Sequence, residues 1–263
     1  MNQSSNLTLF VKAGKDEKCL GACPQSHRVL MLAELKVAAK ILPQFKTIPV
    51  NVSRPPEVFS RLGLRLRVPA LYLGLDEDPI DVADDIVSLL ESRFPGGILQ
   101  QNQEDPEAEL VTRDFFSRFC FYVRGVAKDG SQLESELRRI DFYLQNASSH
   151  GSGNSLFLCG PRPSLLDCEV LPKLHQVRVA AAGIKGYEIP SNLTGLWRYL
   201  HSAYAEPAFV RTCPSDAEIL LHWLEHIGES PANIRKQQHL VLNEKIPQYS
   251  FSVPVFAKPV VLE

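Results

Sequence analysis

The sequence predicts an α/β domain followed by an all-α domain, and three observations support this fold class. Up to residue 93, short apolar runs alternate with segments whose apolar residues recur at helical spacing. The run Phe94-Pro95-Gly96-Gly97 breaks this alternation, and the polar residues up to Pro106 are typical of a linker. Beyond Pro106 the apolar residues keep mainly helical spacing. An α/β unit and a helical unit are therefore expected in that order.

The first domain is expected to span residues 1–94, with elements in the order β-α-β-α-β-β-α. Ile86, Leu89 and Leu90 share one face of its last helix, so that face is expected to be buried. The strands are predicted over residues 7–12, 45–51, 70–73 and 79–82, and the helices over residues 24–39, 56–62 and 84–93.

A linker over residues 95–106 is expected to join this domain to a helical domain over residues 107–228. Ser131 followed by Glu134, and Ser164 followed by Asp167, have the spacing of capping boxes. We assign Ser164 and Asp167 to this structural role rather than to catalysis, because each satisfies otherwise unpaired helix N–H groups. The helices are predicted over residues 106–126, 131–143, 164–182, where Pro172 should produce a kink, and 215–227.

Two further segments are predicted to lack regular secondary structure. Residues 148–155 are rich in serine and glycine and are expected to form a surface loop. From Pro231 onward the composition changes to proline, polar residues and short apolar runs such as Val253-Pro254-Val255-Phe256. Residues 229–263 are therefore predicted to form an extended tail, docked on the surface or on another chain.

Composition and charge exclude several classes of protein. The chain has 263 residues, of which 44% are hydrophobic and 22% are charged, as in ordinary globular proteins. Its formal net charge of −2 and the lack of a dense basic block argue against a nucleic-acid-binding protein. No secretory signal is visible at the N-terminus, so the six scattered cysteines are expected to be mostly reduced thiols in the cytoplasm.

The stretch CLGACPQSHR, residues 19–28, places a cysteine at the start of the first predicted helix. Pro24 occupies a first-turn position, where proline is favoured, and Cys23 directly precedes it. Helix N-termini carry unpaired N–H groups and a positive dipole end, which stabilise a thiolate and favour its nucleophilic chemistry. Because the position of a second motif cysteine is Ser26, Cys23 would form a mixed disulfide with an external thiol. The alternative is that Cys23 only packs a turn.

Several strings of the sequence resemble the chloride intracellular channel family of the glutathione-transferase superfamily. They are Phe10-Val11-Lys12-Ala13-Gly14, Cys23-Pro24-Gln25-Ser26, Leu171-Pro172-Lys173-Leu174-His175, Tyr199-Leu200-His201-Ser202-Ala203-Tyr204 and Cys213-Pro214-Ser215-Asp216. The resemblance covers residues 7 to 228. It implies a glutathione-transferase-like fold, with an N-terminal thioredoxin-like domain and an all-helical C-terminal domain. It also implies a protein that associates with membranes as an anion channel. The alternatives are a glutaredoxin-like, glutathione-dependent thiol oxidoreductase that uses Cys23 and a non-enzymatic interaction or scaffold protein.

The resemblance also implies a site for glutathione, the expected cofactor, with glutathione or protein thiols as partners. Cys23 would be the catalytic residue, and the site would further comprise Lys12, Pro24, Val68, Pro69 and Asp84. Pro69 is expected to be cis, as in thioredoxin-like folds, and Lys12 would hold the thiolate or a glutathione carboxylate, unless it is a solvated surface lysine.

The residues that hold the γ-glutamyl end of glutathione in transferases are replaced in this chain. Val82 and Ala83 stand where the transferase pattern has an acid and a hydroxyl residue. The neighbouring Asp84 and Asp85 are candidates to replace the acid alone, since a carboxylate cannot replace a hydroxyl that faces another carboxylate. Glutathione is therefore expected to bind weakly.

Cys19 is a candidate redox partner for Cys23. A cysteine that pairs with the active cysteine in one family member would fall near Gly63 and is missing here. Cys19 lies four residues before Cys23 in a glycine-containing loop, so a reversible disulfide between them is one hypothesis, and an unpaired loop cysteine is the other. Cys19, Cys23 and His27 lack a fourth ligand at suitable spacing, so no metal site is expected.

The family's membrane-spanning segment corresponds to residues 23–50 of this chain. A span needs about 20 mostly apolar residues, but this segment contains Glu34, Lys36, Lys40, Lys46 and Pro43. Three central charges cost about 7–10 kcal/mol, whereas the apolar side chains return only about 2–4 kcal/mol. Insertion of the lone segment is therefore not expected. A membrane form in contact with lipid would require an oligomer, snorkelling lysines or charges facing a water-filled lumen.

Overall fold

The computed structural model describes residues 7–74, 77–98, 105–147 and 156–255 of the chain. Contacts between Cα atoms divide the chain into two compact units. Unit 1 comprises Met1–Gly97, Arg211–His222 and Ser230–Gln248, and unit 2 comprises Ile98–Val210, Trp223–Glu229 and Tyr249–Glu263. The predicted loop over residues 148–155 and most of the predicted linker lie outside the described residues.

Unit 1 is built on a three-stranded sheet with the order β2-β1-β3. Strand β1 (Thr8–Lys12) pairs in parallel with β2 (Lys46–Val50) and antiparallel with β3 (Ala70–Tyr72). The predicted fourth strand over residues 79–82 is reduced to a single bridge between Ile80 and Leu71. Three of the four predicted strands are thus confirmed, with bounds that differ by at most two residues.

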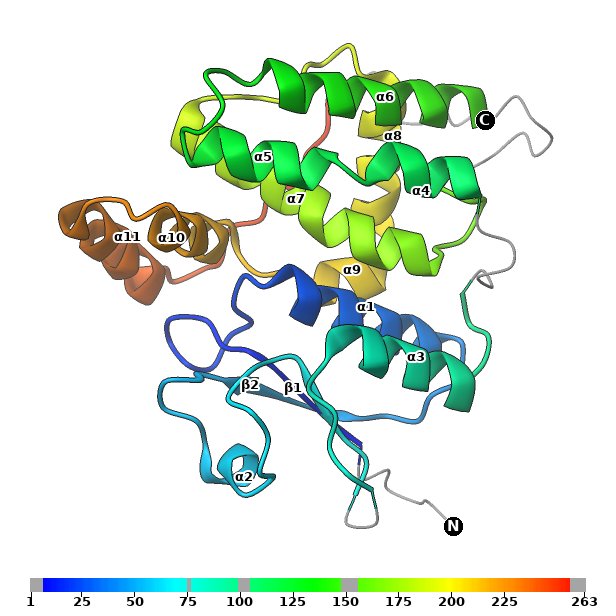
Figure 1. The fold of residues 1–263 in the computed structure, drawn as a ribbon, viewed down its shortest axis with the longest axis vertical. Helices are drawn as coiled ribbons and strands as arrows, with labels where there is room; N and C mark the ends of the chain where they lie inside the picture. Colours follow the sequence, from blue (N-terminus) through cyan, green and yellow to red (C-terminus); the bar gives the residue numbers. More distant parts are fainter. Residues whose placement is uncertain (1–6, 75–76, 99–104, 148–155, 256–263) are drawn as a thin grey trace. The chain divides into compact units, whose positions relative to one another are not determined.

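The helices of unit 1 cover both faces of this sheet. Figure 1 shows α1 (Pro24–Ala38) and α3 (Ala83–Arg93) side by side on one face, with α2 (Glu57–Ser60) on the other. Alternate residues of a strand point to opposite faces, and the Phe10 side chain of β1 packs against Phe59 of α2 with ring centroids 5.1 Å apart. A thioredoxin-like core is therefore formed by β1, β2, β3 and the helices that cover them.

The expectation of an extended tail is wrong for residues 231–243. These residues form helix α11 (Pro231–Asn243), which belongs to unit 1. The Ser230 side chain accepts the N–H of Asn233 at 3.3 Å, and Pro231 occupies the first turn, where it is tolerated. The proline that we interpreted as a sign of an extended chain is instead a helix-start signal.

Unit 2 contains the helices that follow the linker. They are α4 (Pro106–Thr112), α5 (Phe115–Val123), α6 (Ser131–Ala147), α7 (Leu165–Lys185) and α8 (Thr194–Ala205). Helix α5 packs beside α6 and α7, and α6 also packs against α4 and α8 (Figure 1). Helices α9 (Pro207–Thr212) and α10 (Asp216–His226) have residues in both units. The all-helical character of the second half is confirmed.

The prediction of a single helix over residues 106–126 is wrong, because the helix is interrupted between Thr112, the last residue of α4, and Phe115, the first residue of α5. At the end of α4 the Thr112 hydroxyl donates to the backbone carbonyl of Ala108 at 2.7 Å, a type of contact that competes with the backbone hydrogen bonds of a helix. Asp114 then precedes the first residue of α5. The apolar periodicity continues through the break, so it could not indicate where the helix ends.

A buried lysine joins α1 to the end of α3. The Lys36 side chain is fully buried, and its Nζ atom donates to the carbonyls of Phe94 at 2.7 Å and Gly96 at 3.0 Å. It also lies 2.6 Å from a carboxylate oxygen of Glu91. Carbonyls at a helix C-terminus have no partner in their own helix, and the dipole there favours a cation. Lys36 therefore satisfies the C-terminus of α3 from a neighbouring helix.

Within the described ranges, no helix is both long enough and apolar enough to cross a membrane. Helix α1 contains Glu34 and Lys36, in agreement with the charge count made from the sequence.

Candidate functional site

Cys23 is the N-cap residue of α1, immediately before the first helical residue, Pro24. Its Sγ atom accepts the backbone N–H of Ser26 at 3.4 Å. Cys23 is half-buried. A sulfur anion at this position receives an N–H hydrogen bond and faces the positive end of the helix dipole, and both interactions stabilise it.

Ser26 has a structural role besides taking the place of a second cysteine. Its side chain is buried, and its hydroxyl oxygen accepts the backbone N–H of Lys12 at 3.1 Å. This bond fixes the end of β1 to the first turn of α1, where Cys23 lies. The motif is therefore held on two rigid elements, as a site that positions a reacting sulfur requires.

Lys12 lies at the end of β1, but its charged group contacts a histidine far away in the sequence. Lys12 Nζ lies 2.8 Å from Nδ1 of His222, in the part of α10 that belongs to unit 1. An ammonium group only donates hydrogen bonds, so Nδ1 accepts and the imidazole proton belongs on Nε2. In addition, the Glu218 carboxylate accepts the backbone N–H of Lys15 at 2.6 Å.

Cys19 lies in a turn that Asp16 organises. A carboxylate oxygen of Asp16 accepts the N–H groups of Lys18 at 2.9 Å and Cys19 at 2.8 Å. A hydrogen bond from the Cys19 thiol to this carboxylate, together with partial burial, raises the pKa of Cys19. A raised pKa lowers the thiolate fraction, so Cys19 is a poor nucleophile at neutral pH.

We expect Cys23 to be the thiol that alkylating agents modify first. None of the six cysteines takes part in a disulfide bond. Burial raises the pKa of Cys120 and raises that of Cys213 well above the ordinary value, while Cys168 is buried. Iodoacetamide labelling of the native protein between pH 6 and 9, read by peptide mass spectrometry, measures the order of reaction. Faster labelling of Cys120 or Cys168 than of Cys23 would contradict this prediction.

The peptide bond between Val68 and Pro69 is cis, as predicted. Pro69 directly precedes β3, and the Val68 side chain packs against the core formed by Phe10, Val50, Phe59 and Ala70. This packing anchors the peptide that we assigned to the glutathione site.

The start of α3 lacks the polar side chains that the transferase pattern supplies. Val82 is its N-cap residue and gives no side-chain hydrogen bond, and Ala83 is the first helical residue. The carboxylate of Asp84 accepts a hydrogen bond from Arg28 Nη1 of α1 at 2.7 Å, although Asp84 is itself 78% exposed. Asp84 is thus engaged by a neighbouring cation, which weakens it as a substitute for the missing acid.

Ser164 and Asp167 form the predicted capping box at the start of α7. The Ser164 hydroxyl accepts the N–H of Asp167 at 3.3 Å, and the Asp167 carboxylate accepts the N–H of Ser164 at 2.8 Å. Both side chains are fully buried.

Across the described part of the chain, no group of three or more His, Cys, Asp or Glu side chains has the arrangement of a metal site.

Comparison with known proteins identifies the family. The model of the CLIC-like N-terminal domain matches residues 5–94, and the model of the glutathione S-transferase C-terminal domain matches residues 109–202. The chain is 32% identical to chloride intracellular channel exl-1 of Caenorhabditis elegans over 248 residues, which is 94% of this chain and 98% of that protein. This chain belongs to the chloride intracellular channel family.

Two solved structures have the same fold as this chloride intracellular channel homologue. The homologue EXC-4 from C. elegans has a TM-score of 0.76 and 23% identity, covering 96% of this chain and 95% of that one. Dehydroascorbate reductase from Chlamydomonas reinhardtii has a TM-score of 0.69 and 26% identity, covering 84% and 98% of the two chains. Both confirm the glutathione-transferase-like fold.

Proposed function

We propose that this chloride intracellular channel homologue is a monothiol oxidoreductase that uses glutathione as its reductant. The position of Cys23 as the N-cap residue of α1, with its sulfur accepting the Ser26 N–H, is the observation that carries the proposal. The resemblance to a dehydroascorbate reductase supports thiol chemistry on this fold.

The proposed reaction needs one cysteine and two exchange steps. The Cys23 thiolate attacks the glutathione sulfur of a mixed disulfide, the S–S bond breaks, and the substrate leaves as a thiolate that takes a proton. A glutathione thiolate then attacks the mixed disulfide on Cys23, which releases oxidised glutathione and restores the Cys23 thiolate. In sum, the mixed disulfide and one glutathione give the reduced substrate and oxidised glutathione.

The reaction is tested with hydroxyethyl disulfide, glutathione and the full chain, by measuring the rate at which oxidised glutathione forms. The expected result is a rate above the uncatalysed exchange, with glutathione mapped by mass spectrometry to Cys23 in protein trapped during turnover. A rate equal to that without protein, or glutathione attached only to another cysteine, would overturn the proposal.

We expect glutathione to bind weakly, with a dissociation constant of about 1 mM, near −4 kcal/mol. Val82 and Ala83 supply neither the acid nor the hydroxyl for its γ-glutamyl end, and Asp84 is engaged by Arg28. Isothermal titration calorimetry of the native chain measures this affinity. The double variant Val82→Glu/Ala83→Ser restores both groups and is expected to bind glutathione about tenfold more tightly, about 1.4 kcal/mol. Micromolar binding by the native chain would show that our assignment of these positions is wrong.

A disulfide between Cys19 and Cys23 under oxidation is a second proposal about this site. Closing so short a loop costs little entropy, but the hydrogen bond to Asp16 raises the pKa of the Cys19 thiol, so the disulfide should form slowly. In peroxide-treated protein digested without reductant, a linked Cys19–Cys23 peptide would support this switch. Oxidised Cys23 beside unmodified Cys19 would end it.

Anion conductance is the second candidate function, favoured by the name of the 32% identical relative. Because no described helix satisfies the requirements of a membrane span, conductance would require a structural change and association with lipid. Flotation with anionic liposomes, followed by chloride efflux measurements, tests this function. Protein that neither floats nor releases chloride would exclude it under those conditions.

A further inference from the structure

The last described residues form an extended segment that lies on the helices of unit 2. Tyr249–Val255, which we call the C-terminal segment, contains no α-helix or strand. Its residues are half-buried or exposed, with Val255 83% exposed. The segment is therefore held by a few contacts rather than by burial in the core.

Arg178 of α7 binds the backbone of the C-terminal segment at two points. Its two terminal guanidinium nitrogens donate to the carbonyl oxygens of Ser250 and Ser252, which lie two residues apart in an extended chain. The guanidinium is also stacked near the rings of Trp197, at 5.0 Å from the centroid, and Tyr204, at 5.3 Å. These rings hold the planar guanidinium in place. Because the guanidinium binds two backbone carbonyls, this contact does not depend on the side chains of the segment.

Phe251 supplies the side-chain anchor between those two carbonyls. Its ring contacts Tyr204 at 5.0 Å and His175 at 5.6 Å between centroids, and it also contacts Phe209. These three rings come from α7, α8 and α9 and form an aromatic box. An aromatic anchor in a preformed pocket, flanked by backbone hydrogen bonds, is the usual arrangement of a peptide-recognition site.

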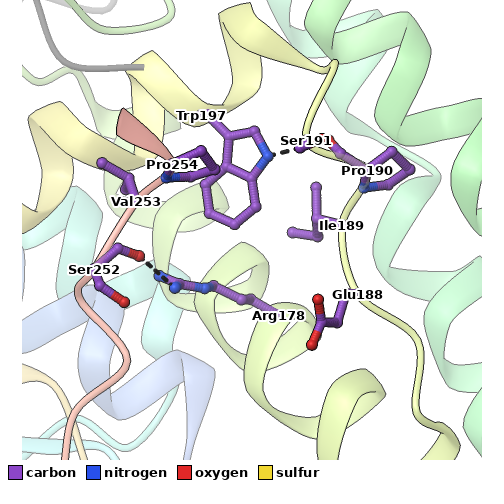
Figure 2. Close-up of a pocket in the computed structure, with 9 residues that line it drawn as sticks. All are labelled: Arg178, Glu188, Ile189, Pro190, Ser191, Trp197, Ser252, Val253 and Pro254. Atoms are coloured by element: carbon purple, nitrogen blue, oxygen red, sulfur yellow. Dashed lines mark hydrogen bonds between the residues drawn. The ribbon is translucent and has the colours of Figure 1, made fainter. Parts of the chain in front are cut away.

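The C-terminal segment leaves part of its groove unfilled. A cavity of about 450 Å³ lies beside it, lined on the helix side by Arg178, Trp197 and the loop 188–191 (Figure 2). Trp197 Nε1 donates to the Pro190 carbonyl at 3.1 Å, which holds the indole as one wall, and Pro254 stands next to that ring. The pocket is open to solvent, so the C-terminal segment covers only part of the surface that these residues form.

We propose that this groove is a peptide-binding site and that the C-terminal segment is its replaceable resident ligand. We expect other ligands of this groove to resemble the C-terminal segment. Such a ligand is an extended peptide with an aromatic residue, an accessible backbone carbonyl on each side of that residue, and a proline three positions later. A partner protein that carries such a peptide would displace the segment. The intramolecular segment competes at a high effective concentration, so it also limits which partners bind.

The test uses a fluorescent peptide with the sequence of residues 248–255 and the full-length chain. The Phe251→Ala chain, with its own anchor removed, is expected to bind this peptide at least about tenfold more tightly than the native chain, because competition by the segment is weakened. A peptide with alanine at position 251 should not bind. The chain Phe251→Ala/Arg178→Gln should lose binding, whereas the matched control Phe251→Ala/Arg198→Gln, altered at an exposed arginine of α8, should keep it.

A second measurement needs no variant. With saturating unlabelled peptide, the amides of residues 249–255 in the native chain should exchange with deuterium faster, because the segment has been displaced. If the Phe251→Ala chain unfolds, this measurement decides alone. The proposal is overturned by unchanged exchange in the native chain, by no binding to a folded Phe251→Ala chain, or by equal binding to the native and Phe251→Ala chains.

Discussion

The Cys23→Ser variant is expected to lose the thiol-exchange activity entirely, a fall of at least about 100-fold, or 2.7 kcal/mol in the barrier. A serine hydroxyl remains protonated at neutral pH and cannot form a disulfide, so both exchange steps are blocked. The helix should be unaffected, because a serine side chain accepts the Ser26 N–H at an N-cap as well as cysteine does. The hydroxyethyl disulfide assay with matched protein concentrations measures the loss.

Cys120→Ser is the matched control for this prediction. Cys120 is also half-buried, but it lies within α5, and burial raises the pKa of its thiol. Its replacement should leave the rate within about twofold of the native value, a change of about 0.4 kcal/mol. Residual activity in Cys23→Ser that disappears only when a second cysteine is replaced would show that another thiol carries the chemistry.

Asp167→Ala is expected to destabilise the protein by about 3–5 kcal/mol, because it breaks a fully buried hydrogen-bond network. The Asp167 carboxylate is fully buried and accepts hydrogen bonds from Ser164 at 2.7 and 2.8 Å, from Leu158 N at 3.1 Å and from the Tyr199 hydroxyl at 2.7 Å. Alanine would leave several buried donors without an acceptor, each at a cost of about 1–3 kcal/mol. Urea unfolding followed by far-ultraviolet circular dichroism measures the change.

Asp129→Ala provides the comparison for the buried cap. Asp129 accepts the N–H of Ser131 at the start of α6 at 3.0 Å, but that contact is exposed. Its loss should cost no more than about 1 kcal/mol, because water can replace the carboxylate. Similar unfolding free energies for Asp129→Ala and Asp167→Ala would show that the Asp167 network contributes little beyond an ordinary helix cap.

The fold followed from the sequence wherever periodicity and caps agreed. Ser164 and Asp167 marked the start of α7 because a capping box is a local pattern, and Leu9 to Val11 marked β1 because a buried strand is a short apolar run. Local sequence patterns gave the wrong secondary structure at two places, the end of α4 and the start of α11. Helix α4 ended at Thr112 inside a continuous apolar repeat, and Pro231 began a helix in a segment whose composition suggested extension.

The candidate site was predictable only in its local part. The position of Cys23 at a helix N-terminus and the cis bond before Pro69 followed from the motif and the family resemblance. The contact of Lys12 with His222 joins residues 210 positions apart, and no pattern in one sequence pairs them. The hydrogen bond between Arg28 and Asp84 was missed for the same reason, since their pairing depends on how α1 and α3 pack.

The burial of Lys36 has a consequence for covalent chemistry on the protein surface. Reagents that acylate amines, and enzymes that acetylate or ubiquitinate lysines, react only with an Nζ atom that is exposed to solvent. In folded unit 1 the Lys36 side chain is fully buried, so its Nζ atom should not react. Lys40 lies four residues further along the chain and is exposed. The ratio of acylation at Lys36 to that at Lys40 therefore reports the fraction of molecules in which α1 has separated from the end of α3, with Lys40 as the internal standard.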